Sequence, residues 1–194
     1  MPPALIYIHG FNSSPASFKA KLLHDRLMAS GGTPQFIAPA LPPSPAAAVK
    51  LLEALVQTQA GALLVGSSLG GYYATWLAEK FDLHAVLVNP AVRPYELLAG
   101  YVGTQKNLHT GQAYEFTPQH IDELRALEAA ALTPRRYLLM VTTGDEVLDY
   151  RDAIAKYRGA QHLVIEGGDH GFSRFAEHVD RVLAFAAAAN SEHV

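Results

Sequence analysis

The amino-acid sequence predicts an α/β protein in which a parallel β-sheet is covered by helices on both faces. Short β-rich runs alternate with longer helical patterns from one end of the chain to the other. Several of the short runs, such as residues 63–65 and 86–88, are apolar at every position, which is typical of parallel strands covered on both faces. Alternation of strands and helices at this spacing is typical of right-handed βαβ units.

Six short runs are predicted to be the strands. They are β-rich and of ordinary strand length, and they span residues 4–9, 35–39, 62–66, 85–89, 137–142 and 162–166. The segments between them are predicted to be helical. Three of these open with a hydroxyl residue followed by proline, which suits the N-cap and the first helical position: Ser14-Pro15, Ser44-Pro45 and Thr117-Pro118.

Two of the helices carry an apolar stripe that predicts their buried face. The spacing i, i+3, i+4, i+7 places such residues on one side of a helix. In the helix after Ser44 the stripe is Ala48, Leu51, Leu52 and Leu55. In the last helix of the chain it is Phe175, Val179, Val182 and Ala186.

Composition and charge exclude several classes of protein. With 194 residues, 49% of them hydrophobic and 17% charged, the chain is expected to fold as one compact domain over residues 1–194. The net charge is −3 and no run of basic residues is present, so nucleic acid is not an expected partner. The chain has no cysteine, which excludes disulfides, thiolate zinc sites and a cysteine nucleophile.

One interval breaks the alternation of strands and helices. The 47 residues between Asn89 and Tyr137 are too many for one crossover helix, and residues 93–116 show no clean periodicity. We expect an excursion over one end of the sheet, followed by a helix near residues 118–130. Excursions of this length are usually lids or binding loops. The sequence therefore predicts a lid or insertion at about residues 91–130.

No targeting segment is visible in the sequence. The apolar stretch at residues 4–8 is too short for a signal core or a membrane span, and Met1-Pro2-Pro3 carries no basic residue. We therefore expect a cytoplasmic protein without a membrane span.

The strongest local signal for chemistry is a serine between glycines. Gly66-Ser67-Ser68-Leu69-Gly70 follows a predicted strand and precedes a predicted helix. At such a turn the pattern G-x-S-x-G holds the serine at a strained bend with its hydroxyl exposed, and the glycines are small because backbone passes close by. Ser68 is the candidate nucleophile and Ser67 is assigned no chemistry. The alternative is an ordinary glycine-rich turn or a phosphate cradle.

A serine nucleophile needs a histidine base, and the base needs a carboxylate. His170 follows the last predicted strand, at the edge of the sheet where catalytic groups of α/β proteins gather. Asp145 follows the fifth strand at the same edge and is the candidate acid. Asp149 is the competing carboxylate, although a negative charge at the start of the next helix would also explain it.

The oxyanion formed in such a reaction needs two hydrogen-bond donors. The N–H of Leu69, the residue after the nucleophile, is one candidate. The other is the N–H of Phe11, on the loop after the first strand, where Gly10 lets the backbone approach. His9 is expected to orient this loop rather than to react.

These residues resemble the α/β-hydrolase superfamily, and within it the small bacterial YqiA/YcfP-like esterases. The resemblance covers nearly the whole chain and is carried by residues 7–14, 66–72, 89–94 and 143–151. It implies a three-layer fold with a six-stranded, mostly parallel sheet in the order 2-1-3-4-5-6. It also implies a Ser-His-Asp hydrolase that cleaves small carboxylic esters or acyl thioesters without a cofactor or metal.

Two other functions remain open from the sequence. The same three residues could serve other acyl-transfer chemistry, as in a peptidase, a perhydrolase or an acyltransferase. The fold could also be a binding module that retains the serine turn only as architecture. No Walker-type loop, dinucleotide fingerprint or H-E-x-x-H motif is present.

Overall fold

The structure, a computed structural model, describes residues 4–31 and 34–191. The first half of the chain contains β1 (Leu5–Ile8), α1 (Phe18–Ala29), β2 (Phe36–Ile37), α2 (Pro45–Thr58), β3 (Leu63–Ser67), α3 (Leu69–Phe81) and β4 (Ala85–Val88). The second half contains α4 (Pro94–Leu97), η1 (Leu98–Tyr101), β5 (Gly103–Lys106), β6 (Ala113–Phe116), α5 (Pro118–Ala126), η2 (Pro134–Arg136), β7 (Tyr137–Thr142), α6 (Tyr150–Lys156), β8 (Gln161–Ile165), η3 (Ser173–His178) and α7 (Val179–Ser191).

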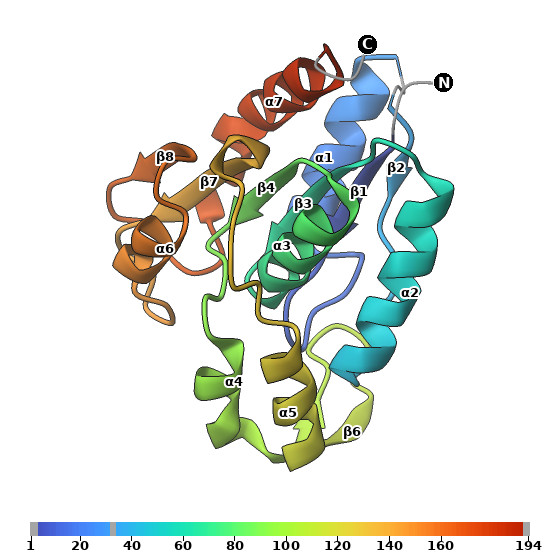
Figure 1. Ribbon diagram of the computed structural model, residues 1–194, viewed down its shortest axis with the longest axis vertical. Coiled ribbons are helices and arrows are strands. Elements are labelled where there is room, and N and C mark those ends of the chain that lie inside the picture. The colour runs from blue at the N-terminus through green and yellow to red at the C-terminus, as the bar shows by residue number, and fades with distance from the viewer. Residues whose placement is uncertain (1–3, 32–33, 192–194) are drawn as a thin grey trace.

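Six strands form the central sheet in the order β2-β1-β3-β4-β7-β8, as Figure 1 shows. Every neighbouring pair in this sheet is parallel. The residues of β1, β3, β4 and β7 are buried at every position, which explains why these runs read as continuously apolar. The six predicted strands and their predicted order are confirmed.

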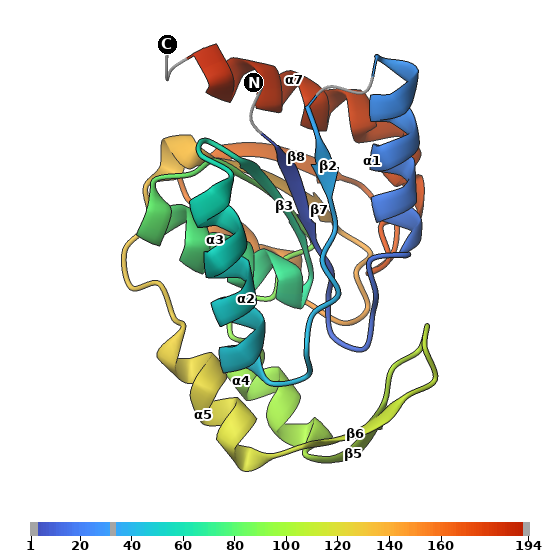
Figure 2. The same ribbon diagram turned by 90° about the vertical axis from the view of Figure 1, so that its right-hand side faces the viewer.

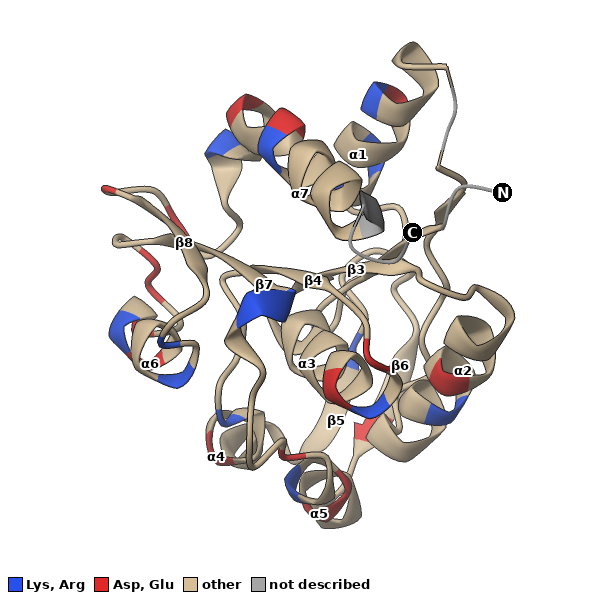
Figure 3. Ribbon diagram, turned by 45° about the horizontal axis from the view of Figure 1, so that its top comes forward, with Lys and Arg blue, Asp and Glu red and all other residues tan. Residues whose placement is uncertain are grey.

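Two apolar layers separate the sheet from the helices. On one face, alternate strand residues such as Ile6, Leu64 and Leu87 pack against α2, α3 and α6. On the other face, Leu5, Val65 and their neighbours pack against α1 and α7. Figures 2 and 3 show the resulting three layers. The expectation of helices on both faces of the sheet is confirmed.

The structure corrects one of the three predicted helix starts. Ser44 caps α2 and Thr117 caps α5, each followed by proline, as predicted. Ser14 does not cap α1. Its Oγ accepts a hydrogen bond from Ala16 N, and the helix begins three residues later with Ser17 as its cap. The Ser-Pro pair forms a turn here because the loop after β1 needs more residues than the local pattern indicates.

The predicted stripe of α2 is partly wrong. Ala48 and Leu52 are buried as expected, but Leu51 is 37% exposed, and Val49 and Val56 are buried instead. The buried face is therefore turned toward Val49, because α5 and α3 lie against that side of α2. In the last helical segment the four predicted residues, Phe175, Val179, Val182 and Ala186, are all buried.

The excursion between β4 and β7 lies at the carboxyl ends of the strands (Figure 2). It consists of α4, η1, a two-stranded antiparallel hairpin (β5 and β6) and α5. The hairpin is not visible in the sequence, since in its strands exposed residues alternate with half-buried or buried ones and there is no continuous apolar run. Helix α5 ends at Ala126, four residues before the predicted end. Within the described part of the chain, each helix is too short or too polar to cross a membrane.

Candidate active site

The backbone at Ser68 makes a sharp turn between β3 and α3. Ser68 has φ 55° and ψ −120°, a conformation that a serine adopts only where the surroundings enforce it. Side chains are excluded on both sides of the turn. A Cβ on Gly66 would lie 2.3 Å from Gly70 O, and a Cβ on Gly70 would lie 2.0 Å from Ile8 O. Both glycines are therefore required by close approach of backbone, as the sequence predicts.

Three sequence-predicted residues form one chain of hydrogen bonds. His170 Nε2 lies 3.0 Å from Ser68 Oγ, and His170 Nδ1 lies 2.8 Å from Asp145 Oδ2. Because a carboxylate can only accept, Nδ1 carries the proton and Nε2 is free to accept one from Ser68. The arrangement can thus remove a proton from the serine hydroxyl and hold it on the histidine.

The Asp145 carboxylate is buried, and both of its oxygens take part in hydrogen bonds. Its side chain is 2% exposed, and its Oδ1 accepts hydrogen bonds from the backbone of Val147 and Leu148. Burial raises the pKa of Asp145, but the bonds from His170, Leu148 and Val147 outweigh it and leave the pKa below its usual value. Asp145 is therefore ionised and fixed toward His170.

Asp149 has a different place in the structure. Its carboxylate caps α6 by accepting a hydrogen bond from Arg151 N at 2.9 Å. It has no contact with His170 among the described hydrogen bonds and ion pairs. The structure thus brings Asp145, and not Asp149, to the histidine.

The loop that carries His170 is held by side chains from distant segments. Asn89 Nδ2 donates to the carbonyls of Asp169 and His170, each at 3.1 Å. Lys19 Nζ donates to Gly171 O at 2.6 Å, and Glu146 Oε2 accepts from His170 N at 3.0 Å. Three consecutive carbonyls and one amide are therefore fixed from outside the loop.

Lys19 and Asn89 are unusual in themselves. Lys19 is 9% exposed, and burial lowers its pKa to about 8, although the negative charges of Asp169 and Asp145 oppose the shift. Asn89 has a positive φ of 41° and is 3% exposed. Sequence reasoning missed the roles of both residues and of Glu146. For Asn89 a signal existed, since a polar residue directly after a buried strand lies at the sheet edge where ligands bind. Lys19 offered none.

The two predicted oxyanion donors belong to residues that line the same hollow as Ser68. The N–H groups of Leu69 and Phe11 donate no hydrogen bond within residues 4–31 and 34–191. His9 holds the Phe11 loop in place. Its Nε2 accepts from Leu41 N at 3.3 Å and its Nδ1 lies 3.0 Å from Gly10 O. Burial lowers the pKa of His9, so this histidine is a neutral structural link between two loops.

Two hollows meet at Phe11 and Leu69. The smaller one, about 510 Å³, includes Ser68 and His170 and is otherwise lined mainly by apolar residues of α4 and η1. The larger one, about 790 Å³, lies between the loops after β1 and β2 and the β5–β6 hairpin. Phe11 and Leu69 line both. A substrate carbonyl at Ser68 would have space on both sides.

Comparison with known proteins agrees with this fold. A family model described as "Uncharacterised protein family (UPF0227)" matches residues 4–187. Among solved structures, Est1E from Butyrivibrio proteoclasticus superposes with a TM-score of 0.69 at 15% identity, covering 96% of this chain and 88% of that one. Alpha/beta hydrolase domain-containing protein 10 from mouse gives 0.68 at 16%, covering 95% and 90%. The esterase domain of a Rhodothermus marinus protein gives 0.65 at 20%, covering 97% and 87%. These likenesses show an α/β-hydrolase fold.

Proposed function

This chain belongs to the UPF0227 family and has an α/β-hydrolase fold, and we propose that it is a serine hydrolase that cleaves carboxylic esters or acyl thioesters through an acyl-enzyme. The observation that carries the proposal is the hydrogen-bond chain from Ser68 Oγ through His170 to Asp145. A nucleophile, a base and a carboxylate in this relation recur on unrelated folds that perform acyl transfer.

The first half of the reaction acylates Ser68. His170 Nε2 takes the hydroxyl proton while Ser68 Oγ bonds to the substrate carbonyl carbon. Asp145 stabilises the imidazolium that forms. The tetrahedral intermediate then breaks the bond to the leaving oxygen or sulfur, and His170 returns the proton to that atom. An acyl group remains on Ser68.

The second half returns the enzyme to its starting state. Water loses a proton to His170 Nε2 and bonds to the acyl carbon. The bond to Ser68 Oγ breaks, and His170 gives the proton back to the serine. In both halves the negative oxygen of the intermediate would accept hydrogen bonds from the N–H groups of Leu69 and Phe11. Neither N–H donates to another group among the described residues.

Other features support an ester or thioester as the substrate. Two of the similar structures carry names that describe esterases or hydrolases, although the likeness itself extends only to the fold. The hollow at Ser68 is largely apolar, which suits an organic ester. Peptide hydrolysis, perhydrolysis and acyl transfer begin with the same acylation, so they are outcomes that the experiment below must separate.

The test is labelling with a fluorophosphonate followed by a panel of acyl donors. The reagent should attach to Ser68, and Ser68→Ala should abolish both labelling and turnover. Ser67→Ala, one residue away and buried, is the matched control and should keep both. Turnover of esters and thioesters, without turnover of peptides or transfer to added acceptors, supports the proposal. Labelling at Ser67, or full turnover by Ser68→Ala, would contradict it.

A further inference from the structure

The larger hollow beside the serine has a lining without charged side chains. Its walls are the loop after β1, the loop between β2 and α2, the end of the β5–β6 hairpin and the first turns of α3. Among the described residues that line it there is no Lys, Arg, Asp or Glu. His9, the one ionisable base in the wall, has its pKa lowered by burial. The hollow therefore suits an uncharged group.

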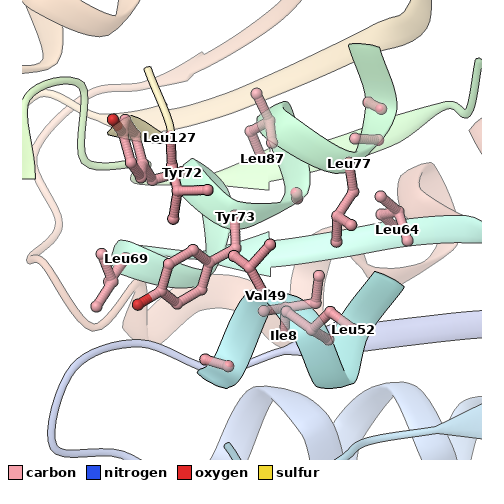
Figure 4. Close-up of a cluster of buried hydrophobic side chains, with 14 of the residues drawn as sticks. Ile8, Val49, Leu52, Leu64, Leu69, Tyr72, Tyr73, Leu77, Leu87 and Leu127 are labelled. Carbon is pink, nitrogen blue, oxygen red and sulfur yellow. The ribbon is translucent and has the colours of Figure 1, made fainter. Parts of the chain in front are cut away.

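Tyr73 brings an unused hydrogen-bonding group to this hollow. The residue is 3% exposed and lines the hollow, and its hydroxyl has no hydrogen-bond partner among the residues that the structure describes. Figure 4 shows the ring between Leu69 and Val49, with the oxygen at the end away from Leu64 and Leu77. The one fully buried side-chain polar atom without a partner among the described residues is His178 Nε2, so the Tyr73 oxygen is open to the hollow that the residue lines. There it can bond to water or to a polar atom of a ligand.

The Tyr73 hydroxyl is neutral at any working pH. Burial raises its pKa far above the ordinary value, and the negative charge of Glu123 raises it further. The group can therefore donate or accept a hydrogen bond but cannot supply charge. An anionic ligand group would also lie in the field of Glu123, which disfavours it.

Gly10 leaves a path from Ser68 into the hollow. A Cβ built on Gly10 would lie 3.1 Å from Ser68 Cβ and 3.6 Å from Ser68 Oγ, and Gly10 is part of the hollow's wall. A side chain here would fill the space between the serine and the hollow. With glycine, a chain attached to the carbonyl can pass directly from one to the other.

The proton that His170 must deliver shows which hollow takes the leaving group and which takes the acyl group. The leaving atom has to lie within hydrogen-bond reach of His170 Nε2, and His170 lines only the smaller hollow. The leaving group then occupies that side, and the acyl group occupies the other.

We propose that the hollow at Tyr73 is the acyl subsite, and that the Tyr73 hydroxyl selects uncharged acyl groups that carry a hydroxyl or carbonyl oxygen. This inference rests on the proposed serine-hydrolase function and adds the class of acid that the enzyme releases. The hydroxyl is a positioned partner for the substrate, whereas the aromatic ring and the rest of the wall accept its hydrocarbon part.

The experiment measures kcat/KM for two series of esters. In the first, all esters share 4-nitrophenol and the acyl groups come in pairs, unsubstituted or with a hydroxyl or oxo group at successive positions. In the second, one acyl group is kept and the alcohol is varied. Tyr73→Phe should lower the substituted-to-unsubstituted ratio for the best acyl pair by about two- to thirteen-fold, as expected for one neutral hydrogen bond. The effect should be the same for every alcohol.

Tyr72→Phe is the matched control. Tyr72 is buried next to Tyr73, but its hydroxyl donates to Leu124 O and does not line the hollow, so its removal should leave the ratio unchanged. The acyl-subsite proposal is wrong if Tyr73→Phe leaves the kcat/KM ratio unchanged, or if its effect depends on the alcohol and not on the acyl group. In either case labelling of Ser68 and turnover of esters would still support the proposed function. Failure of the wild type to react with the fluorophosphonate or any ester removes both.

Discussion

The turn at Ser68 and the loop at His170 are positioned in opposite ways. Ser68 is held by backbone: its N–H donates to Val88 O, and the adjacent glycines pack directly on main-chain atoms of β1 and α3. At His170 itself the loop is held mainly by side chains, namely Asn89, Lys19, Glu146 and Thr142, although the start of the loop also bonds through backbone, from Gly144 N to Gly167 O. The turn at Ser68 therefore requires residues without side chains. The loop at His170 instead requires particular hydrogen-bond donors and acceptors around it.

The difference predicts how each region should respond to substitution. Where backbone fills the space, even one methyl group has no room, and the response is loss of the fold. Where side chains hold a loop by separate bonds, each bond can be removed with the fold intact, and the response is graded loss of rate. Substitutions in the two regions therefore test this contrast.

Gly70→Ala should prevent folding or lower the melting temperature drastically. The added Cβ would lie 2.0 Å from Ile8 O, 2.6 Å from Ile8 C and 2.7 Å from His9 O, so β1 and α3 would have to separate. Gly100→Ala is the matched control, because a Cβ there meets nothing within 4 Å. Circular dichroism with thermal melting measures both. A Gly70→Ala protein as stable as Gly100→Ala would show that the turn tolerates side chains.

Asp145→Asn should keep the fold and lower kcat by up to about four orders of magnitude. The amide would favour the wrong tautomer of His170, so that Nε2 could no longer accept the serine proton. Asp149→Asn should lose less than tenfold, because asparagine is an equally good cap for α6. The comparison requires esterase assays on variants with equal circular dichroism spectra. The reverse ranking would make Asp149 the acid and would contradict the geometry at His170.

The same contrast explains what the sequence could predict. The six strands, the glycines around Ser68 and the positions of Ser68, His170 and Asp145 follow from local patterns, because strand ends and backbone turns have local signatures. The order of the strands in the sheet follows only from the resemblance to a known family. The long-range hydrogen bonds that hold the His170 loop do not follow from local patterns. Lys19 lies 152 residues before its partner Gly171, and Asn89 lies 81 before His170. Hydrogen bonds between segments this far apart depend on how helices and strands pack, which no window of sequence contains.

The β5–β6 hairpin and the cap of α1 were missed for related reasons. The hairpin is fixed partly by contacts with the loop after β1, since Tyr114 donates to Asn12 Oδ1 at 2.7 Å and Asn107 Nδ2 to Ser13 O at 2.8 Å. Its strands are only four residues each and carry no continuous apolar run, so the local pattern does not identify them. At α1, Ser14 and Ser17 are equally suitable caps by type, and only the length of the preceding loop decides between them.

Asn89→Ala should lower kcat by about ten- to a hundredfold with little change in KM. It removes the donor to two carbonyls of the His170 loop and the acceptor for Thr142 N. A displacement of the base by about 1 Å is enough for a loss of up to about a hundredfold. Asn89→Asp keeps the shape and the acceptor but not the donor, so it should lose at least as much. If the aspartate variant retains full kcat, the residue only fills space and the loop is held without it.

Lys19→Met should have the smallest effect on rate, below tenfold, because Asn89 and Glu146 still hold the loop. Its clearer effect is on stability as a function of pH. Burial lowers the pKa of Lys19 to about 8 in the folded protein, against about 10.4 for an unfolded chain. Between these values the unfolded chain binds a proton that the folded protein does not. The stability of the wild type relative to Lys19→Met should therefore rise as the pH increases from about 8 to about 10.4. The gain is lost as the pH falls to about 8, and below this value both states are protonated and the difference is constant.

The rise should amount to about 1–2 kcal/mol between pH 7 and pH 9.5, since each unit of pKa difference corresponds to about 1.4 kcal/mol and the window is not complete at pH 9.5. Urea unfolding of both proteins at several pH values measures it. The negative groups that face Lys19, Asp169 and Asp145, are present in both proteins, so their own titration cancels to first order. Lys21→Met, on the exposed side of α1, controls for the loss of one positive charge. A stability difference independent of pH would mean that the ammonium of Lys19 is hydrated, and that the loop at His170 is held by Asn89 and Glu146 without a buried charge.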